Sequence, residues 1–177
     1  ETLHGGGPAD FREHCLEAAA RLLVLGKRSA DLEQARAQAE AALTDGRAWE
    51  KFRTLVAAQG GDVRFIDEPA RLPSAAVEVV VKAQRAGWLA QVHARIIGET
   101  AVEMGAGRAK KEDSIDHGVG ILVHGKVGDS IAVGQPLFTI YARTREEAAA
   151  ARARLEQSLA WSDEYVSPLP LFYGIIE

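Results

Sequence analysis

The 177-residue sequence is poor in cysteine, in long apolar runs and in excess positive charge, and each absence excludes a class of protein. Its single cysteine, Cys15, cannot form an internal disulfide, and its place on the apolar side of an expected helix predicts a small buried side chain. No apolar run approaches the roughly 20 residues of a membrane-spanning helix. The net charge of −4, with both signs interspersed, provides no basic surface for nucleic acid. With no signal-peptide pattern, these absences predict a cytoplasmic protein that binds neither nucleic acid nor membrane.

The sequence also contains no metal-ligand or nucleophile motif. Its five histidines form no His-x-x-x-His pair, and none lies at ligand spacing from a cysteine or a carboxylate cluster. His117 follows Asp116, but adjacent residues on a strand point to opposite faces, which favours an ordinary exposed position over acid–base catalysis. No Gly-x-Ser-x-Gly elbow is present. We therefore expect no metal site and no cofactor in this chain.

Apolar residues recur at helical spacing through the first third of the chain. The first helix is expected to start at Pro8, which suits a first helical turn, and to end at Gly26. Two further amphipathic helices are closed by glycine-containing turns at 45–46 and 60–61. These patterns predict a helical section over residues 8–59. The face of the first helix expected to be buried comprises Phe11, Cys15, Ala18, Ala19, Leu22 and Leu23.

Residues 60–76 break this helical rhythm and are the best candidate for a boundary, because they combine glycine, aspartate and two prolines. Beyond them, residues 77–82 alternate in the manner of a strand, and residues 87–93 are its expected partner. A helix then leads to Met104. Strands replace packed helices at this point of the chain.

The remaining residues predict more short strands and one helix. Residues 119–141 contain short strands joined at glycines, a pattern typical of a small barrel or sandwich. A charged, alanine-rich helix is expected from Thr144 to Leu159, and residues 161–176 are expected to add a closing strand at a sheet edge, because their prolines cannot join a sheet centre. The buried stripe of the helix is expected to be Ala148, Ala151 and Leu155. The fold class is therefore α+β, with an N-terminal helical segment and then a domain containing a small barrel-sandwich-like β element.

The most informative segment is the charged loop that follows Met104. Gly105 and Gly107 end the preceding helix. The basic side chains there favour either of two roles, a clamp for an anion or a solvated ion-pair network with the neighbouring acids, and the network is the commoner arrangement in such loops. The charged residues are Arg108, Lys110, Lys111, Glu112, Asp113 and Asp116.

Residues 126–137 are similar to the half-barrel of biotinyl and lipoyl carrier domains. A carrier lysine needs a tight hairpin to display it, whereas Lys110 and Lys111 lie in a longer loop without an Ala-Met-Lys-Met type of tetrapeptide. The similarity therefore indicates shared architecture. A non-catalytic carrier or interaction module remains the alternative interpretation.

Several short motifs together resemble the C-terminal region of the pyrimidine-nucleoside phosphorylases, the thymidine phosphorylase group. They are Gly6-Gly-Pro8, Gln59-Gly-Gly-Asp62, Gly105-Ala-Gly-Arg108, Lys111-Glu-Asp113, Ile115-Asp116 and Lys126-Val-Gly-Asp129. The resemblance implies that residues 1–62 end the α/β domain of such an enzyme and that residues 63–177 form its C-terminal α+β domain.

The resemblance also implies a function for the longer enzyme. Members of this family use inorganic phosphate as co-substrate to displace the pyrimidine from thymidine or uridine, giving the free base and a pentose 1-phosphate. Their phosphate- and base-binding motifs lie in an upstream part that this sequence does not contain, so no catalytic residue is assigned here. The chain alone is expected to be inactive and not to form the family homodimer, and the preference between thymidine and uridine depends on pocket residues absent from it.

One hypothesis concerns the charged loop itself. Gly105, Gly107, Arg108 and Lys111 are expected to form a flap near the nucleoside cleft, because glycines permit motion and the neighbouring charges can change partners when domains close.

Overall fold

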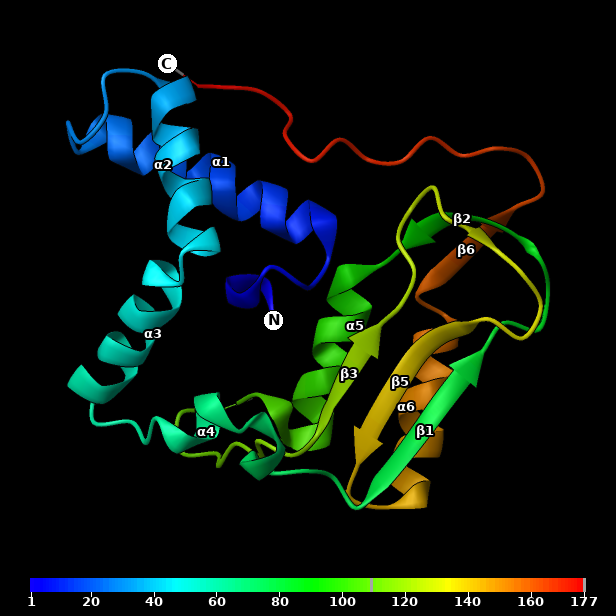
Figure 1. Ribbon diagram of the computed structural model, residues 1–177. Helices are drawn as coiled ribbons and strands as arrows, with labels where there is room; N and C mark the ends of the chain where they lie inside the picture. The colour runs from blue at the N-terminus through cyan, green and yellow to red at the C-terminus, as the bar shows by residue number, and fades with distance from the viewer. Residues whose placement is uncertain (109, 177) are drawn as a thin grey trace. The chain divides into compact units, whose positions relative to one another are not determined.

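The computed structural model describes residues 1–108 and 110–176, which pack as two compact units (Figure 1). One unit contains Glu1–Arg71 together with residues 171–176, and the other contains Leu72–Pro170. Among the described residues, no helix combines the length and the apolar character needed to cross a bilayer. The units describe how this chain packs, and the assignment of residues 1–62 and 63–177 to two domains of a longer enzyme stays a prediction.

The first unit is helical, as the sequence predicts. Its elements are η1 (Thr2–His4), α1 (Ala9–Leu25), α2 (Leu32–Thr44), α3 (Arg47–Ala58), α4 (Arg64–Asp67) and η2 (Pro69–Arg71). Pro8 occupies the N-cap of α1, and the Asp31 carboxylate caps α2 by accepting from the Gln34 amide at 2.9 Å. The pairs α1–α2 and α2–α3 pack together.

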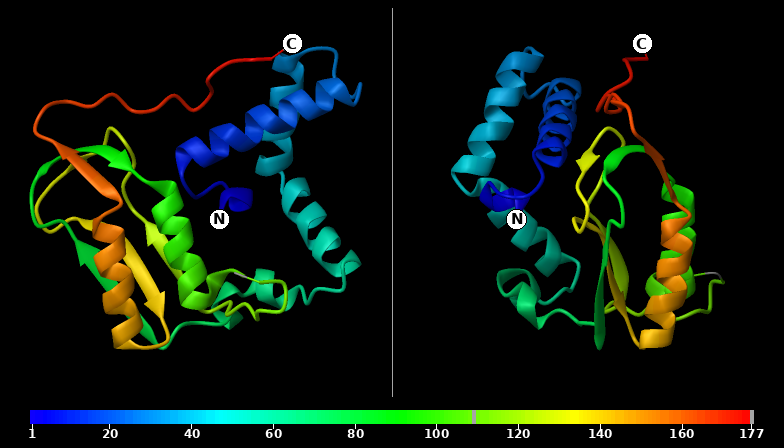
Figure 2. Two further views of the ribbon diagram at one scale, coloured as in Figure 1. Left: turned by 180° about the vertical axis from the view of Figure 1, so that it is seen from behind. Right: turned by 90° about the vertical axis from the view of Figure 1, so that its right-hand side faces the viewer.

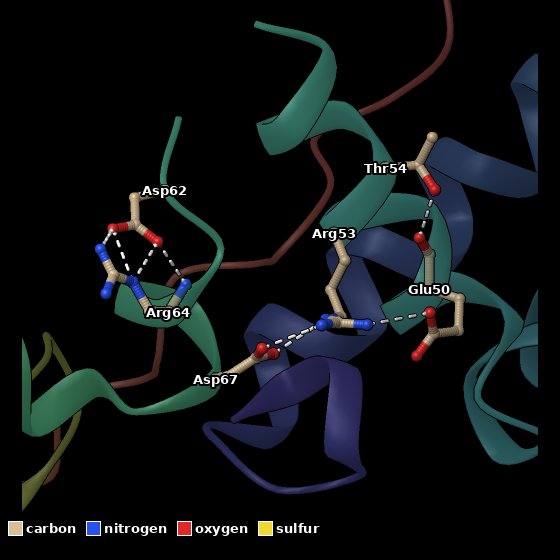
Figure 3. Close-up of polar contacts among 6 residues, drawn as sticks. All are labelled: Glu50, Arg53, Thr54, Asp62, Arg64 and Asp67. Carbon is tan, nitrogen blue, oxygen red and sulfur yellow. Dashed lines mark hydrogen bonds and ion pairs between the residues drawn. The ribbon is translucent and has the colours of Figure 1, made fainter. Parts of the chain in front are cut away.

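Ion pairs connect α3 to α4 in the helical unit (Figure 3). Arg53 of α3 donates from Nε and Nη2 to the two oxygens of Asp67, at 2.8 and 2.9 Å. Glu50 lies on the other side of the Arg53 guanidinium, at 3.4 Å. These contacts join α3 to α4 in a bidentate geometry that a lysine cannot reproduce.

The buried face of α1 differs from the expected one. Leu16 and Ala20 are the buried residues of the helix, whereas Phe11 is 54% and Leu22 is 68% exposed. Cys15 is only half-buried, so its assignment to the core is wrong. The small side chain of Ala35 on α2 is fully buried and α1 packs against α2, so the stripe of α1 that enters the contact is one position away from the most apolar stripe.

Two antiparallel sheets form the frame of the second unit. Strands β1 (Val77–Lys82), β5 (Pro136–Ala142) and β3 (Gly120–Val123) pair in the order β1-β5-β3. Strands β4 (Ser130–Ile131), β2 (Gly87–Val92) and β6 (Leu159–Ser162) pair in the order β4-β2-β6. With the helices, these sheets confirm the α+β class, while a barrel-sandwich arrangement stays a prediction.

Two helices cover one face of the first sheet (Figure 2). They are α5 (Ala94–Ala101) and α6 (Arg145–Glu156), and they pack against each other and against β3, β5 and β1. The fully buried side chains of Phe138, Ile140 and Leu155 meet in this layer. The buried stripe expected on the last helix, Ala148, Ala151 and Leu155, is confirmed.

The expected pairing of residues 77–82 with residues 87–93 is wrong. Lys82 already opposes Pro136, and Ala83 continues the contact by bonding to the turn that precedes β5. The chain then crosses to the other sheet, where Gly87 takes a φ of 150° and a Cβ there would lie 2.9 Å from the Ser162 carbonyl oxygen. β1 therefore pairs with β5, and β2 pairs with β4 and β6 in the other sheet.

The end of the chain contributes an edge strand and then an extended segment. β6 lies at the edge of its sheet and ends at Ser162. The expected closing strand over residues 161–176 is therefore wrong, because the described residues after Ser162 form no further strand. Tyr165 contacts Trp88 edge-on at 4.9 Å. Within the helical unit, the Phe172 ring stacks on His14 of α1 at 5.7 Å. The tail is thus held by aromatic contacts.

Candidate functional site

The charged loop begins where α5 tightens and breaks. The helix passes into a π turn, η3 (Val102–Ala106), whose Met104 side chain is 3% exposed. Gly105 then takes a φ of 96°, which side-chain-bearing residues rarely adopt. A buried anchor followed by a left-handed glycine turns the chain out of the helix at a defined point.

The second glycine is needed for close packing. Gly107 has an extended backbone, and a Cβ placed on it would lie 2.8 Å from Cγ2 of Val102. Any larger residue would push the chain away from the π turn. The glycines therefore fix the path of the loop at its start.

Two local hydrogen-bonding patterns shape the rest of the loop. The Lys110 amide donates to the Asp113 carboxylate at 2.8 Å, and the Asp113 amide returns a bond to the Lys110 carbonyl at 3.1 Å. At the loop's far end the Asp116 amide donates to the Gly105 carbonyl at 2.9 Å, which closes the loop across its neck. Asp116 also accepts from the Gly118 amide at 2.9 Å. The segment is thus a closed loop with a formed turn at its tip.

The side chains of Arg108 and Lys111 take no part in the hydrogen bonds described above. Both are exposed, and neither side chain has a hydrogen bond or ion pair within the part of the chain that the structure describes. The ion-pair network weighed from the sequence does not include these two residues. The loop therefore presents two cations to solvent above a fixed neck.

Sequence reasoning missed one contact to the loop. Arg143, which follows β5, donates from Nη2 to the Met104 carbonyl at 2.9 Å and to the Glu147 carboxylate at 2.6 Å. It lies 39 residues from Met104 in the sequence. Only the Thr144-x-x-Glu147 spacing, a helix N-terminus signature, marks this region in advance.

The turn at Lys126 is built unlike a carrier hairpin. Its amide donates to the Asp129 carboxylate at 2.8 Å, and a Cβ on Gly128 would lie 2.6 Å from Pro168. Pro168 thus covers the glycine of the turn. Nothing in this arrangement supports the carrier interpretation.

The described residues bring no three metal-binding side chains together. His124 contacts the Thr139 hydroxyl at 2.8 Å through Nε2, which occupies one ring nitrogen. The sequence also places His117 in the loop, where it is exposed.

A groove of about 570 Å³ lies within the helical unit, between α1 and α2. Apolar side chains from α1 and α2, with one each from η1 and α3, line it, and Gln38 and Arg47 supply the polar groups. Those apolar side chains are Leu3, Cys15, Leu16, Ala19, Leu22, Leu23, Ala39, Ala42, Leu43 and Ala48. The half-buried state of Cys15 follows from its place in this groove.

Comparison with known proteins gives a consistent result along the chain. Residues 88–162 match the model of the pyrimidine nucleoside phosphorylase C-terminal domain. The chain is 38% identical to a pyrimidine-nucleoside phosphorylase of Geobacillus stearothermophilus over 99% of this chain and 40% of that protein. It is 44% identical to the Bacillus subtilis (strain 168) protein of the same name over 80% of this chain and 33% of that protein. The alignments therefore span 40% and 33% of the length of these two curated relatives.

Proposed function

We propose that this chain, which is homologous to the C-terminal part of the pyrimidine-nucleoside phosphorylases, works as that part of a longer enzyme. Such an enzyme is a pentosyltransferase: inorganic phosphate displaces the pyrimidine from thymidine or uridine, and a pentose 1-phosphate is formed. The observation that carries the proposal is an alignment that covers 99% of this chain and only 40% of the relative.

The helical unit supports this proposal because it has almost no core of its own. Leu16, Ala20 and Ala35 are its only buried apolar side chains among the described residues. Burial of apolar surface contributes about 25 cal/mol of stabilisation for each Å² removed from water, and exposed apolar surface does not make this contribution. A unit of this size with so small a core needs a further partner to be stable.

The groove between α1 and α2 is where this partner binds. Leu22 lines the groove and is 68% exposed, and Leu23 lies beside it. In the proposal the occupant is the N-terminal part of the longer enzyme. The relatives are longer than this chain, and the groove is an apolar surface that such an additional part can cover. Burial of the groove then completes the core that the helical unit lacks.

The chain by itself is inactive in this proposal. Catalysis of phosphorolysis requires groups that bind phosphate and donors that stabilise the departing pyrimidine anion. The N-terminal part supplies these groups, and it also supplies the contact for the homodimer of the longer enzyme. Sedimentation of the chain and of the longer enzyme tests the second point: the chain should sediment as a monomer and the longer enzyme as a dimer.

The loop acts as a flap beside the nucleoside cleft in this proposal. Gly105 and Gly107 set its path, and Arg108 and Lys111 are the charges available to a bound anion when the cleft closes. The test is Arg108→Ala in the longer enzyme, which should raise KM or lower kcat. Arg95→Ala removes another exposed arginine, on α5, and is the matched control. Unchanged kcat and KM in the Arg108 variant would remove the flap from the mechanism.

The central experiment is release of free base from thymidine and uridine by the purified chain in phosphate buffer, with its intact mass measured on the same sample. We expect no turnover from the chain and turnover once the N-terminal part is added. Turnover by the chain alone would overturn the proposal.

Thermal unfolding distinguishes the flap function from a second function, in which this chain serves the longer enzyme only as a packing module. Truncating a packing module lowers the stability of the longer enzyme without altering the kinetics of molecules that remain folded. Arg108→Ala should instead alter the kinetics and leave the stability unchanged, because the Arg108 side chain is exposed.

A further inference from the structure

Among the described residues of the charged loop, one backbone hydrogen bond closes the neck. It joins the amide of Asp116 to the carbonyl of Gly105, at 2.9 Å. A lone hydrogen bond in a solvent-accessible loop opens easily unless other contacts hold the backbone on either side of it. What fixes the neck therefore decides how the loop is presented.

The Arg143 guanidinium lies against this neck. Its nitrogens and central carbon would be 3.6 to 3.8 Å from a Cβ on Gly105, which is ordinary van der Waals contact. Its Nη2 donates to the carbonyl of Met104, the residue just before the neck. The positive charge also lies close enough to Asp116 for that carboxylate to raise the pKa of Arg143, after the larger contribution from Glu147.

Arg143 is itself held in place by the start of α6. Glu147 accepts from the Arg143 amide at 2.8 Å and from its guanidinium at 2.6 Å. The Glu147 amide donates to the Thr144 hydroxyl, which caps the helix. The Arg143 hydrogen bond lowers the pKa of Glu147, with partial burial opposing it, so the pair is fully charged at neutral pH.

A chain of contacts thus runs from a helix cap to the loop neck. α6 fixes Glu147, Glu147 fixes the Arg143 guanidinium, and the guanidinium fixes the Met104 carbonyl at the point where the chain leaves its helix. We propose that Arg143 is a positioning residue for the charged loop, which it orients by bracing the loop's neck. It touches no substrate in this proposal and acts through Met104, and its effect on catalysis rests on the flap function proposed above.

The first test uses this chain and does not depend on activity. Hydrogen exchange of the Asp116 amide reports the neck bond directly, and tryptic cleavage after Arg108, Lys110 and Lys111 reports exposure of the loop. Arg143→Ala should speed both by about tenfold, the size expected for loss of a hydrogen bond from a charged donor. Arg143→Lys keeps the charge and should restore part of the protection.

Arg152→Ala is the matched control. Arg152 lies on α6 and forms an i,i+4 pair with Glu156 at 2.8 Å, and among the described residues this pair has no hydrogen bond or ion pair to the loop. The control should leave exchange at Asp116 unchanged. Equal exchange in the Arg143 and Arg152 variants would overturn the proposal, and so would a faster rate in Arg143→Ala that extends equally to the β5 amides, since that result means general unfolding.

The second test concerns catalysis and separates the two proposals. In the longer enzyme, Arg143→Ala should raise KM for the nucleoside more than it lowers kcat. The KM of Arg143→Lys should lie between the KM of Arg143→Ala and that of the parent. Faster exchange with unchanged kinetics supports the brace and refutes the flap function. Changed kinetics with unchanged exchange refutes the brace.

Discussion

The carboxylate of Asp62 accepts hydrogen bonds from both the backbone amide and the guanidinium of Arg64, at 3.0 and 2.6 Å (Figure 3). Asp45 and Arg47 repeat this arrangement one helix earlier, at 3.1 and 2.8 Å. In both cases the aspartate stands two residues before the first residue of a helix. A negative charge at this place satisfies free amides and favours the start of the helix.

Replacing Arg64 should change the titration of Asp62. The Arg64 side-chain and backbone hydrogen bonds lower the pKa of Asp62 from 3.8 to about 2. Because the folded-state pKa is the lower one, the stabilisation is complete above 3.8 and is lost as the pH falls toward 2. Arg64→Ala should therefore raise the pKa of Asp62 toward 3.8, measured by carboxyl ¹³C NMR.

The control for this titration is Arg47→Ala. It should raise the lowered pKa of Asp45 and leave the pKa of Asp62 unchanged. An Arg64 variant in which Asp62 still titrates near 2 would contradict the assignment of the shift to Arg64.

Phe138→Ala should strongly destabilise the second unit. The Phe138 side chain is fully buried in the core beneath α6, and truncating it leaves a cavity. We expect a loss of about 3–5 kcal/mol in the free energy of unfolding, measured by urea denaturation with tryptophan fluorescence. Val133→Ala removes an apolar side chain that is 67% exposed and should change it by less than about 0.5 kcal/mol. Similar losses in the two variants would mean that the core is misassigned.

Two glycines of the α5 region should respond oppositely to alanine. Gly98 lies within α5 with open space around the position of a Cβ, so Gly98→Ala should stabilise the unit by about 0.5–1 kcal/mol. Gly105 has a φ of 96°, so Gly105→Ala should destabilise it by about 1–3 kcal/mol. Thermal unfolding of the two variants, compared with the parent, measures both effects. A stabilising Gly105→Ala would show that the left-handed turn is not required.

The groove of the helical unit is tested by Leu22→Ser. Leu22 is 68% exposed in this chain, so the substitution should change the stability of the chain by less than about 0.5 kcal/mol. In the longer enzyme it should cost about 2 kcal/mol, because the proposed occupant of the groove would bury this side chain. Leu25→Ser is the control, since Leu25 is 77% exposed on the same helix but does not line the groove. An equal and small effect of both variants in the longer enzyme would leave the groove without an occupant.

Local signals predicted several elements well. The last helix is one example: its buried stripe of Ala148, Ala151 and Leu155 follows from helical spacing and is confirmed, although the helix ends at Glu156 and not at the expected Leu159. The short strands after residue 119 follow from their glycine turns. Such features depend on residues close together in the sequence, which is why they were visible.

Features that depend on distant residues were not predicted. Alternation marks β1 and β2 as strands but carries no information on their partners, and β1 pairs with a strand more than fifty residues later. At the candidate site, the glycines and charges identified the loop, while its brace by Arg143 depends on a contact across 39 residues. The buried stripe of α1 was misjudged because which side chains are buried depends on how α1 packs against α2, and the sequence of α1 alone does not show this.

The helical unit is assembled from two separate pieces of chain, Glu1–Arg71 and residues 171–176. During synthesis, the ribosome makes all of Leu72–Pro170 between them. The stacking of Phe172 on His14 therefore forms only after the second unit has been translated. Of the two units, the helical one therefore contains both the earlier-made and the later-made residues, and it is completed after the other.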